Sequence, residues 1–224
     1  MHLRLAHSHP CDLTIAQAKE IQLQLASKVI LEDRLPDEIH YVAGVDVGFE
    51  DSGKITRAAV TVLKYPSLQL QESSLIKIDT CFPYVPGYLS FRELPAVLKA
   101  FEQLNLRPDI VLCDGQGIAH PRRLGIASHL GVLTGLPSIG VAKSRLIGEA
   151  REPGRQKGSK CLLYDGNEKI GYVLRTRTDV KPLYISPGHK VSLMTACDIV
   201  LKCTTKYRLP ETTRTAHHLA SESK

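Results

Sequence analysis

The alternation of apolar and polar residues divides the chain into short segments with either a helical or a strand-like period. In the first segment an apolar residue recurs every three or four positions, which predicts an amphipathic helix over residues 13–31 with Asp12 or Thr14 as its N-cap. Three apolar runs then follow closely, at residues 40–48, 55–65 and 68–80. Their close spacing and the turn at Pro66-Ser67 predict an antiparallel meander.

Helical and strand-like segments alternate in the rest of the chain. We expect a helix capped by Ser90 and ending near Leu104, and another from Pro121 to about Leu133. Further strands are expected at 108–115, 136–144, 160–164, 169–176 and 182–186, followed by helices at 190–203 and 210–221. This order predicts an α/β fold, an open mixed central sheet with helices on both faces, built as one domain over residues 1–224.

Charge adds a functional hint to this pattern. The formal net charge is +6 and the pI is about 9.0, with basic residues concentrated at 143–160 and 169–190 and acidic residues at 32–51. A basic region beside an acidic one suits a metal-dependent enzyme that acts on a polyanion, whose binding would weaken as salt rises. The commoner explanation of such charge runs is a solvated surface.

Cysteine spacing and apolar run lengths exclude several classes of protein. The six cysteines include no C-x-x-C pair, which argues against a zinc or redox motif. Cys113 and Cys161 lie in apolar runs and are expected to be buried. Without a signal-peptide pattern or an apolar run of ~18 residues, we expect a reduced, cytoplasmic protein with no membrane association.

Three acidic residues are the main candidates for chemistry. Asp46 and Asp114 each end an apolar strand, where an ionised carboxylate is costly unless it is paired or binds a metal. If the two strands are neighbours, both carboxylates meet at one edge, and Glu93 can supply a third. Oxygen ligands of this kind favour Mg²⁺. The structural explanations that compete with a metal site are a strand-end cap for each aspartate and a first-turn helix acid for Glu93.

Basic and glycine-rich segments around these acids suggest phosphate contacts. Backbone N–H groups near 115–117 can face a phosphate or line a pocket, although the glycine pattern alone is weak. Lys143 ends another apolar strand and could neutralise charge on a phosphoryl oxygen, or could be a surface lysine. His217 and His218 are adjacent on the last helix, so at most one of them can face the site.

The segment F-P-Y-V-P-G-Y-L-S-F-R-E-L (82–94) concentrates aromatic residues on a turn stiffened by proline. We expect Phe82 and Phe91 to anchor this turn in the core. Tyr84 would then be presented rigidly to a flat ligand, whereas Tyr88 could pack inward or face the ligand. The competing explanation is a turn that only fills the core.

Several long motifs together resemble the endonuclease V family over residues 13–220. They are V-A-G-V-D-V-G-F, P-Y-V-P-G-Y-L-S-F-R-E, D-G-Q-G-I-A-H-P-R-R-L-G-I-A-S-H-L-G, I-G-V-A-K-S and Y-R-L-P-E-T-T-R-T-A. The resemblance implies an RNase H-like fold and a DNA repair endonuclease dependent on Mg²⁺, for which Mn²⁺ can substitute. Such an enzyme recognises deaminated bases, chiefly deoxyinosine. It hydrolyses the second phosphodiester bond on the 3′ side and leaves 3′-hydroxyl and 5′-phosphate ends.

The resemblance also assigns roles to individual residues. The catalytic positions correspond to Asp46, Glu93, Asp114 and Lys143, and the metal positions to Asp46, Asp114, Glu93 and His217, with His218 as the alternative to His217. Tyr84 corresponds to the wedge tyrosine. The expected substrate-binding residues are Pro83, Tyr84, Gly87, Gly115, Gln116, Gly117, His120 and Arg122. The family's usual P-E-P-T-R reads P-E-T-T-R here, which could loosen the start of the last helix.

Three different functions compete with this interpretation. An actin-like sugar kinase or ATPase also opens with a G-x-D-x-G strand but needs a second similar domain, for which 224 residues leave little room. A non-catalytic inosine-binding module would bind the same base without cutting, and a related nuclease could be directed at inosine in RNA. The expected partner is DNA that contains deaminated bases, bound by a monomer.

Overall fold

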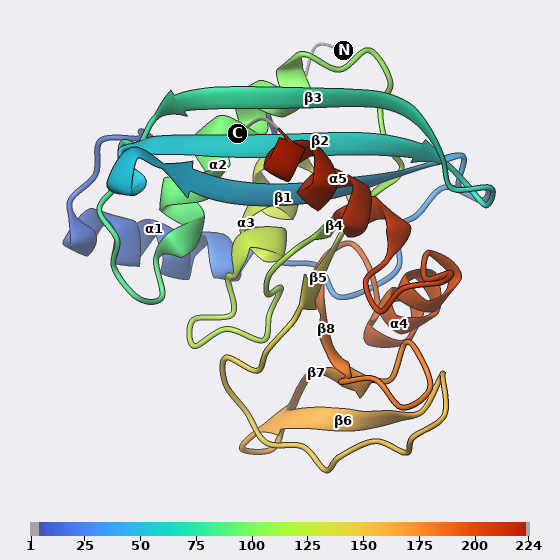
Figure 1. Ribbon diagram of the computed structural model, residues 1–224. Coiled ribbons are helices and arrows are strands. Elements are labelled where there is room, and N and C mark those ends of the chain that lie inside the picture. Colours follow the sequence, from blue (N-terminus) through green and yellow to red (C-terminus); the bar gives the residue numbers. More distant parts are fainter. Residues whose placement is uncertain (1–4, 223–224) are drawn as a thin grey trace.

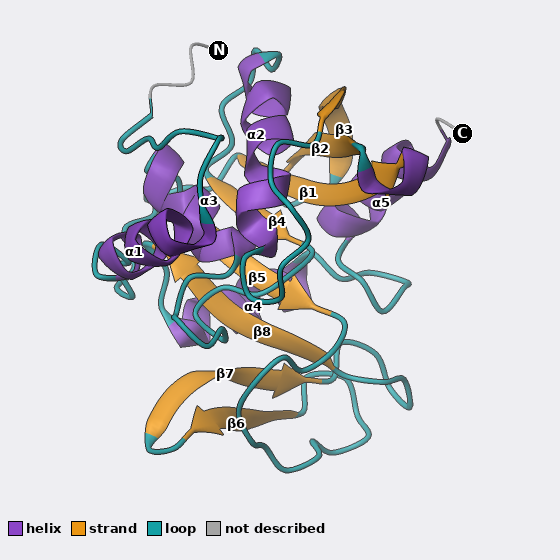
Figure 2. Cartoon of the chain, turned by 90° about the vertical axis from the view of Figure 1, so that its left-hand side faces the viewer, coloured by secondary structure: helices purple, strands orange, loops and turns teal. Residues whose placement is uncertain are grey.

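The computed structural model describes residues 5–222, and its central feature is an eight-stranded mixed β-sheet (Figure 1). The strands are β1 (Tyr41–Glu50), β2 (Ile55–Lys64), β3 (Gln69–Asp79), β4 (Ile110–Cys113), β5 (Ser138–Ala142), β6 (Lys160–Asp165), β7 (Glu168–Leu174) and β8 (Leu183–His189). They lie in the order β3-β2-β1-β4-β5-β8-β7-β6 (Figure 2). The helices are α1 (Ile15–Ala26), α2 (Leu89–Glu102), α3 (Ile126–Thr134), α4 (Leu193–Lys202) and α5 (Glu211–Glu222), with a short 3₁₀ turn η1 (Asp51–Gly53).

Strand pairing places two chemistry-bearing strand ends side by side. The predicted meander is confirmed, because β1 pairs antiparallel with β2, and β2 with β3. On its other edge β1 pairs in parallel with β4, and β4 with β5. Carboxyl ends of parallel neighbours meet at the same edge of a sheet, which is where ligands bind in open α/β sheets. Asp46, Asp114 and Lys143 all lie at or just beyond this edge.

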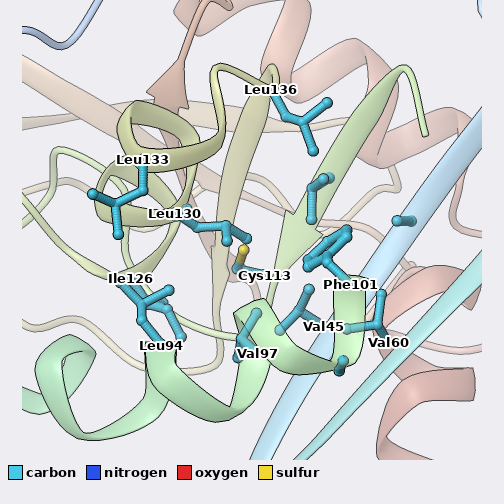
Figure 3. Close-up of a cluster of buried hydrophobic side chains, with 14 of the residues drawn as sticks. Val45, Val60, Leu94, Val97, Phe101, Cys113, Ile126, Leu130, Leu133 and Leu136 are labelled. Atoms are coloured by element: carbon cyan, nitrogen blue, oxygen red, sulfur yellow. The ribbon is translucent and has the colours of Figure 1, made fainter. Parts of the chain in front are cut away.

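Alternating side chains of the central strands build a core on each face of the sheet. Ala43 and Val45 pack with α2 and α3, while Val42 packs on the α4 side. In Figure 1, α5 crosses in front of β1 and β2, and α2 and α3 lie behind them. Figure 3 shows the larger cluster, in which Leu94, Val97 and Phe101 of α2 meet Leu130 and Leu133 of α3. The prediction of helices on both faces is therefore confirmed.

The first helix is shorter than its apolar period predicts. The helix was expected to reach residue 31, but α1 ends at Ala26, and Thr14 rather than Asp12 is its N-cap. The Ile30 backbone has other partners: its N–H donates to His189 Nδ1 (3.3 Å), and its carbonyl accepts from Lys190 N–H (2.7 Å). Tertiary pairing with the end of β8 therefore replaces the last helical turn.

Two other helix starts differ from expectation. The helix expected from Pro121 begins at Ile126, because Arg123 has a left-handed backbone (φ 57°) that interrupts a helix. Ser90 is not a cap: Tyr88 is the N-cap residue of α2, and the Ser90 hydroxyl bonds to His129 instead. Cys113 is buried as expected, but Cys161 is partly exposed. Among residues 5–222, no helix is long and apolar enough to cross a bilayer.

Candidate active site

Three carboxylates from three separate elements converge at the carboxyl edge of the sheet. Asp46 lies on β1, Asp114 directly follows β4, and Glu93 lies in the first turns of α2. The backbone joins the first two, since the Asp114 N–H donates to the Val45 carbonyl (3.1 Å). Asp46 and Glu93 are both buried. The sheet and helix thus bring together the acids that the sequence singled out.

The electrostatics of these carboxylates show that they face one another without full compensation. Burial raises the pKa of Glu93 to about 8, with Asp114 and Asp46 adding to the shift. Burial and the neighbouring Asp114 also raise the pKa of Asp46. Like charges in a buried site favour protonation or the binding of a cation. Groups with such perturbed pKa values in a cleft are typical of functional sites.

Lys143 and His217 complete the charged cluster. The Lys143 ammonium pairs with the Asp114 carboxylate, and His217 Nδ1 lies 3.2 Å from Asp46 Oδ2. His217 therefore faces the site, whereas its neighbour His218 lines a separate small pocket beside Leu70 and Ser73. Arg208 Nη2 donates to the Lys143 carbonyl (3.0 Å), which fixes the backbone that carries this lysine.

The donor set of this cluster fits a hard divalent cation. Among residues 5–222, no three acidic, histidine or cysteine side chains already stand as a ready metal-binding group. Asp114 and Asp46 each direct one oxygen to a basic partner, Lys143 and His217. The mutual repulsion of three oxygen-bearing acids is nevertheless what a cation such as Mg²⁺ relieves.

A cavity of about 460 Å³ opens beside the carboxylates. Glu93, Asp114 and Lys143 lie along it, together with the expected residues Gly87, Gly115, Gln116 and His120. The rest of its lining is supplied by Val85, Pro86, Leu89, Ser90, Gly125, Ile126, Ala142, Ser144, Arg145 and Leu146, with Tyr84. Its mainly apolar wall with a few polar groups resembles a small-ligand pocket in size and composition.

Two of the expected substrate-binding residues, Gly117 and His120, are packed inside the protein. Gly117 is packed against the backbone, since a Cβ there would lie 2.0 Å from the Pro187 carbonyl oxygen. His120 is buried, and burial together with the nearby Arg122 lowers its pKa to about 4, so it is neutral at pH 7. Pro83 and Gly117 are not among the residues that line the cavity.

The aromatic segment divides into buried anchors and one exposed ring. Phe82 and Phe91 are buried with ring centroids 5.7 Å apart, as expected. Tyr84 is 71% exposed at the cavity rim. Tyr88 packs inward, with the Arg122 guanidinium 4.2 Å from its ring centroid.

Arg122 holds the turn between Tyr84 and Tyr88 in place through a hydrogen bond and a ring contact. It does not line the cavity, and its Nη2 donates to the Gly87 carbonyl (2.7 Å), which also accepts from Gln22 Nε2 (3.1 Å). These hydrogen bonds hold the turn that presents Tyr84. Arg122 Nε also donates to Gln22 Oε1 of α1, a contact that cannot be read from the spacing of the sequence motif.

Part of the cavity wall has no signal in the sequence. Ser90 of α2, Ile126 of α3 and Leu146 of the loop after β5 are distant in the chain, and no sequence pattern assigned any of them to a pocket. Gln116 was singled out only as a neighbour of glycines, yet its Nε2 donates to the Ser144 carbonyl (3.0 Å) and holds the Lys143–Leu146 loop. Only the fold shows that these segments meet.

Known proteins share both the sequence and the fold that build this site. The family model Endonuclease V matches residues 23–218. The chain belongs to the endonuclease V family. Endonuclease V of Nostoc punctiforme is 60% identical over 220 residues, covering 98% of this chain and 99% of the relative. The endonuclease V crystal structure from Streptomyces avermitilis superposes with a TM-score of 0.91 at 42% identity, covering 100% and 97% of the two chains.

A third endonuclease V structure contains nucleic acid. The Ciona intestinalis protein (D234N), in complex with a 23mer DNA containing an inosine followed by a ribo-adenosine, superposes with a TM-score of 0.81. It is 33% identical, and the match covers 93% of this chain and 95% of that one. The expected RNase H-like α/β fold is confirmed by these matches to endonuclease V structures.

Proposed function

We propose that this member of the family is a Mg²⁺-dependent DNA repair endonuclease that recognises deoxyinosine and hydrolyses the second phosphodiester bond on its 3′ side. The observation that carries the proposal is the convergence of Asp46, Glu93 and Asp114 beside a cavity of about 460 Å³, which is large enough to admit an extruded base. The complex of the Ciona relative with inosine-containing DNA supports the substrate class.

The residues of the site suit hydrolysis of a phosphodiester. Asp46, Glu93 and Asp114 would hold Mg²⁺, which supplies charge stabilisation at the scissile phosphate, and Mn²⁺ can take its place. Water attacks the phosphorus as the P–O3′ bond breaks, which yields 3′-hydroxyl and 5′-phosphate ends. Glu93, buried beside Asp114 and Asp46, would ligate the metal or orient the attacking water. The Lys143 ammonium stabilises negative charge on the phosphoryl oxygens.

The cavity suits a base extruded from the duplex. Hypoxanthine pairs less well than the parent base, so unstacking it costs less, on the order of a few kcal/mol. Tyr84, exposed at the rim, can fill the gap as a wedge, while Gly87, Gly115 and His120 line the wall. Gln22 and Arg122 stiffen the turn beneath the wedge.

A matched pair of substitutions tests the metal-site assignment. Asp46→Asn should lower the nicking rate in Mg²⁺ on the order of 100-fold or more, because it removes a charged oxygen ligand. Asp37→Asn is the control, since this exposed acid lies in a different groove, beside Glu38 and Lys202. Mg²⁺ should also raise the melting temperature of the wild type but not of Asp46→Asn. Near-normal nicking by Asp46→Asn would contradict the assignment.

A further inference from the structure

A chain of hydrogen bonds runs from the N-terminal segment through the core to the cavity wall. The segment is tied to α3 by the Ala6 N–H, which donates to the Leu133 carbonyl (2.7 Å). His9 Nε2 then lies 2.9 Å from His129 Nε2, and His129 Nδ1 lies 3.0 Å from Ser90 Oγ. The rings of His9 and His129 also pack on Phe91, with centroids 5.2 and 4.8 Å away.

The contact between His9 and Pro10 determines which atom donates in each of these hydrogen bonds. His9 Nδ1 lies 2.8 Å from the carbonyl oxygen of Pro10. A carbonyl only accepts hydrogen bonds, so Nδ1 of His9 must carry the hydrogen. When Nδ1 carries the one ring hydrogen of His9, Nε2 has only a lone pair, so His129 Nε2 is the donor in the contact between the two rings.

The buried ring of His129 transmits this direction to Ser90. His129 is fully buried, and burial holds its pKa well below the usual value, so it is neutral with a single ring hydrogen. That hydrogen is on Nε2, which leaves a lone pair on Nδ1. The Ser90 hydroxyl must therefore donate its hydrogen to His129, and its oxygen retains only lone pairs for other partners.

Ser90 lines the cavity between Leu89 and Glu93. We infer that the Ser90 oxygen is a fixed hydrogen-bond acceptor in the base pocket and selects a purine that carries a hydrogen on N1. The inference rests on the proposed function, because it names a specificity-determining residue for the same pocket. His129 and His9 are positioning residues that keep the hydroxyl from rotating its hydrogen into the cavity.

The chemistry of the bases makes such an acceptor discriminating. Hypoxanthine presents an N1–H donor beside an O6 acceptor, whereas adenine presents an N1 lone pair beside an N6 amino donor. The first N–H groups of a helix lack intrahelical partners, so the start of α2 at Leu89 places backbone donors next to the Ser90 acceptor. A donor beside an acceptor complements hypoxanthine and opposes adenine at both atoms, which separates the deaminated base from its parent.

The first test is independent of activity. The ¹⁵N and ¹H NMR signals of the histidine rings at pH 7.5 report which nitrogen carries the hydrogen in each neutral ring. The chain of hydrogen bonds requires His9 as the Nδ1–H tautomer and His129 as the Nε2–H tautomer. His129 protonated on Nδ1 would overturn the inference, because the Ser90 hydrogen would then be free to turn toward the cavity.

The second test measures base selection. Duplexes containing deoxyinosine or deoxynebularine, whose purine has no N1–H, are cleaved under single-turnover conditions by the wild type and by Ser90→Ala. The rate constant for deoxyinosine should fall about tenfold, equivalent to about 1.4 kcal/mol, while the rate constant for deoxynebularine stays within twofold. A merely structural role would lower both rate constants alike and would overturn the inference.

Ser128→Ala is the matched control. Ser128 is also a buried serine, on α3 beside His129, and it does not line the cavity. Its ratio of deoxyinosine to deoxynebularine cleavage should equal that of the wild type. If the wild type fails to cleave deoxyinosine at all, the proposed function itself fails; if it cleaves and Ser90→Ala keeps the wild-type ratio, only the role of Ser90 fails.

Discussion

At the scale of single residues, the two tyrosines of the aromatic segment have opposite environments although they are four positions apart. Tyr84 is 71% exposed beside the cavity, whereas Tyr88 is 8% exposed and packs under Arg122. Their shared sequence context therefore carries two functions. One ring is available to the nucleic acid, and the other holds the loop that presents it.

Replacement of these tyrosines should separate binding from stability. Tyr84→Ala should weaken binding of an inosine-containing duplex about tenfold, because a stacked aromatic ring contributes about 1–3 kcal/mol, and should leave the melting temperature unchanged. Tyr88→Ala should instead lower the free energy of unfolding by about 3 kcal/mol, because it removes a buried aromatic ring. Fluorescence anisotropy and thermal melting measure the two effects. Unchanged affinity of Tyr84→Ala would count against a wedge.

At the scale of elements, the position of α5 depends on a glycine in β1. A Cβ at Gly44 would lie 2.0 Å from the Thr212 carbonyl oxygen, so α5 lies directly on the strand. The same helix carries His217 to Asp46. The close approach of strand and helix backbones thus sets one side of the active site.

Gly44→Ala should move α5 away from β1. We expect the free energy of unfolding to fall by about 2–3 kcal/mol, since the clashing atoms are backbone atoms that cannot rotate away. Chemical denaturation measures this loss. Gly154→Ala is the control, because the nearest atom to its new Cβ is a side-chain oxygen of Ser159 at 3.0 Å. Equal stability of the two variants would show that the close approach of Thr212 to Gly44 does not restrict the residue at position 44.

The sequence predicted the elements better than their ends. Apolar runs located the central strands because β2 and β4 are almost wholly buried, and the carboxylates Asp46 within β1 and Asp114 after β4 showed where charge meets the core. The end of α1 depends on a partner distant in the chain, His189, which accepts from the Ile30 N–H, and the start of α3 depends on the left-handed backbone of Arg123. Neither can be read from the apolar period.

The sequence also predicted only part of the candidate site. The carboxylates, Lys143 and the exposed Tyr84 follow from motifs and from the cost of burying charge. Ser90 and His129 could not be assigned, because a serine in a first helical turn is more often a cap and a histidine in an apolar run shows no partner. Their contact joins two helices that meet only after folding.

At the scale of the whole molecule, several histidines are buried in neutral form and should make the fold sensitive to acid. Burial, with Arg122 or Lys190 adding to it, lowers the pKa of His120 and of His189 to about 4, and burial holds the pKa of His129 well below its usual value. In the unfolded chain each histidine takes up a proton near pH 6.5. The unfolded state therefore binds more protons below that pH, and acid favours it.

The free energy of unfolding should fall as the pH drops from about 6.5 toward 4, by about 1–2 kcal/mol for each such histidine at pH 5. Denaturant titrations at several pH values measure this slope. His189→Asn tests one of these contributions, because an amide oxygen can still accept the Ile30 N–H but does not titrate in this range. Its free energy of unfolding should therefore depend less steeply on pH than that of the wild type. A slope identical to that of the wild type would contradict the contribution of His189.

The measurement that tests the central claim most directly is a cleavage gel with end-labelled DNA and RNA strands, each containing a single inosine, with Mg²⁺ and with EDTA. We predict one nick in the DNA duplex, at the second phosphodiester bond 3′ to the inosine, with a 5′-phosphate on the downstream fragment. No nick should form in EDTA or in inosine-free DNA. Binding without a nick in any metal, or a nick only in the RNA strand, would contradict the account.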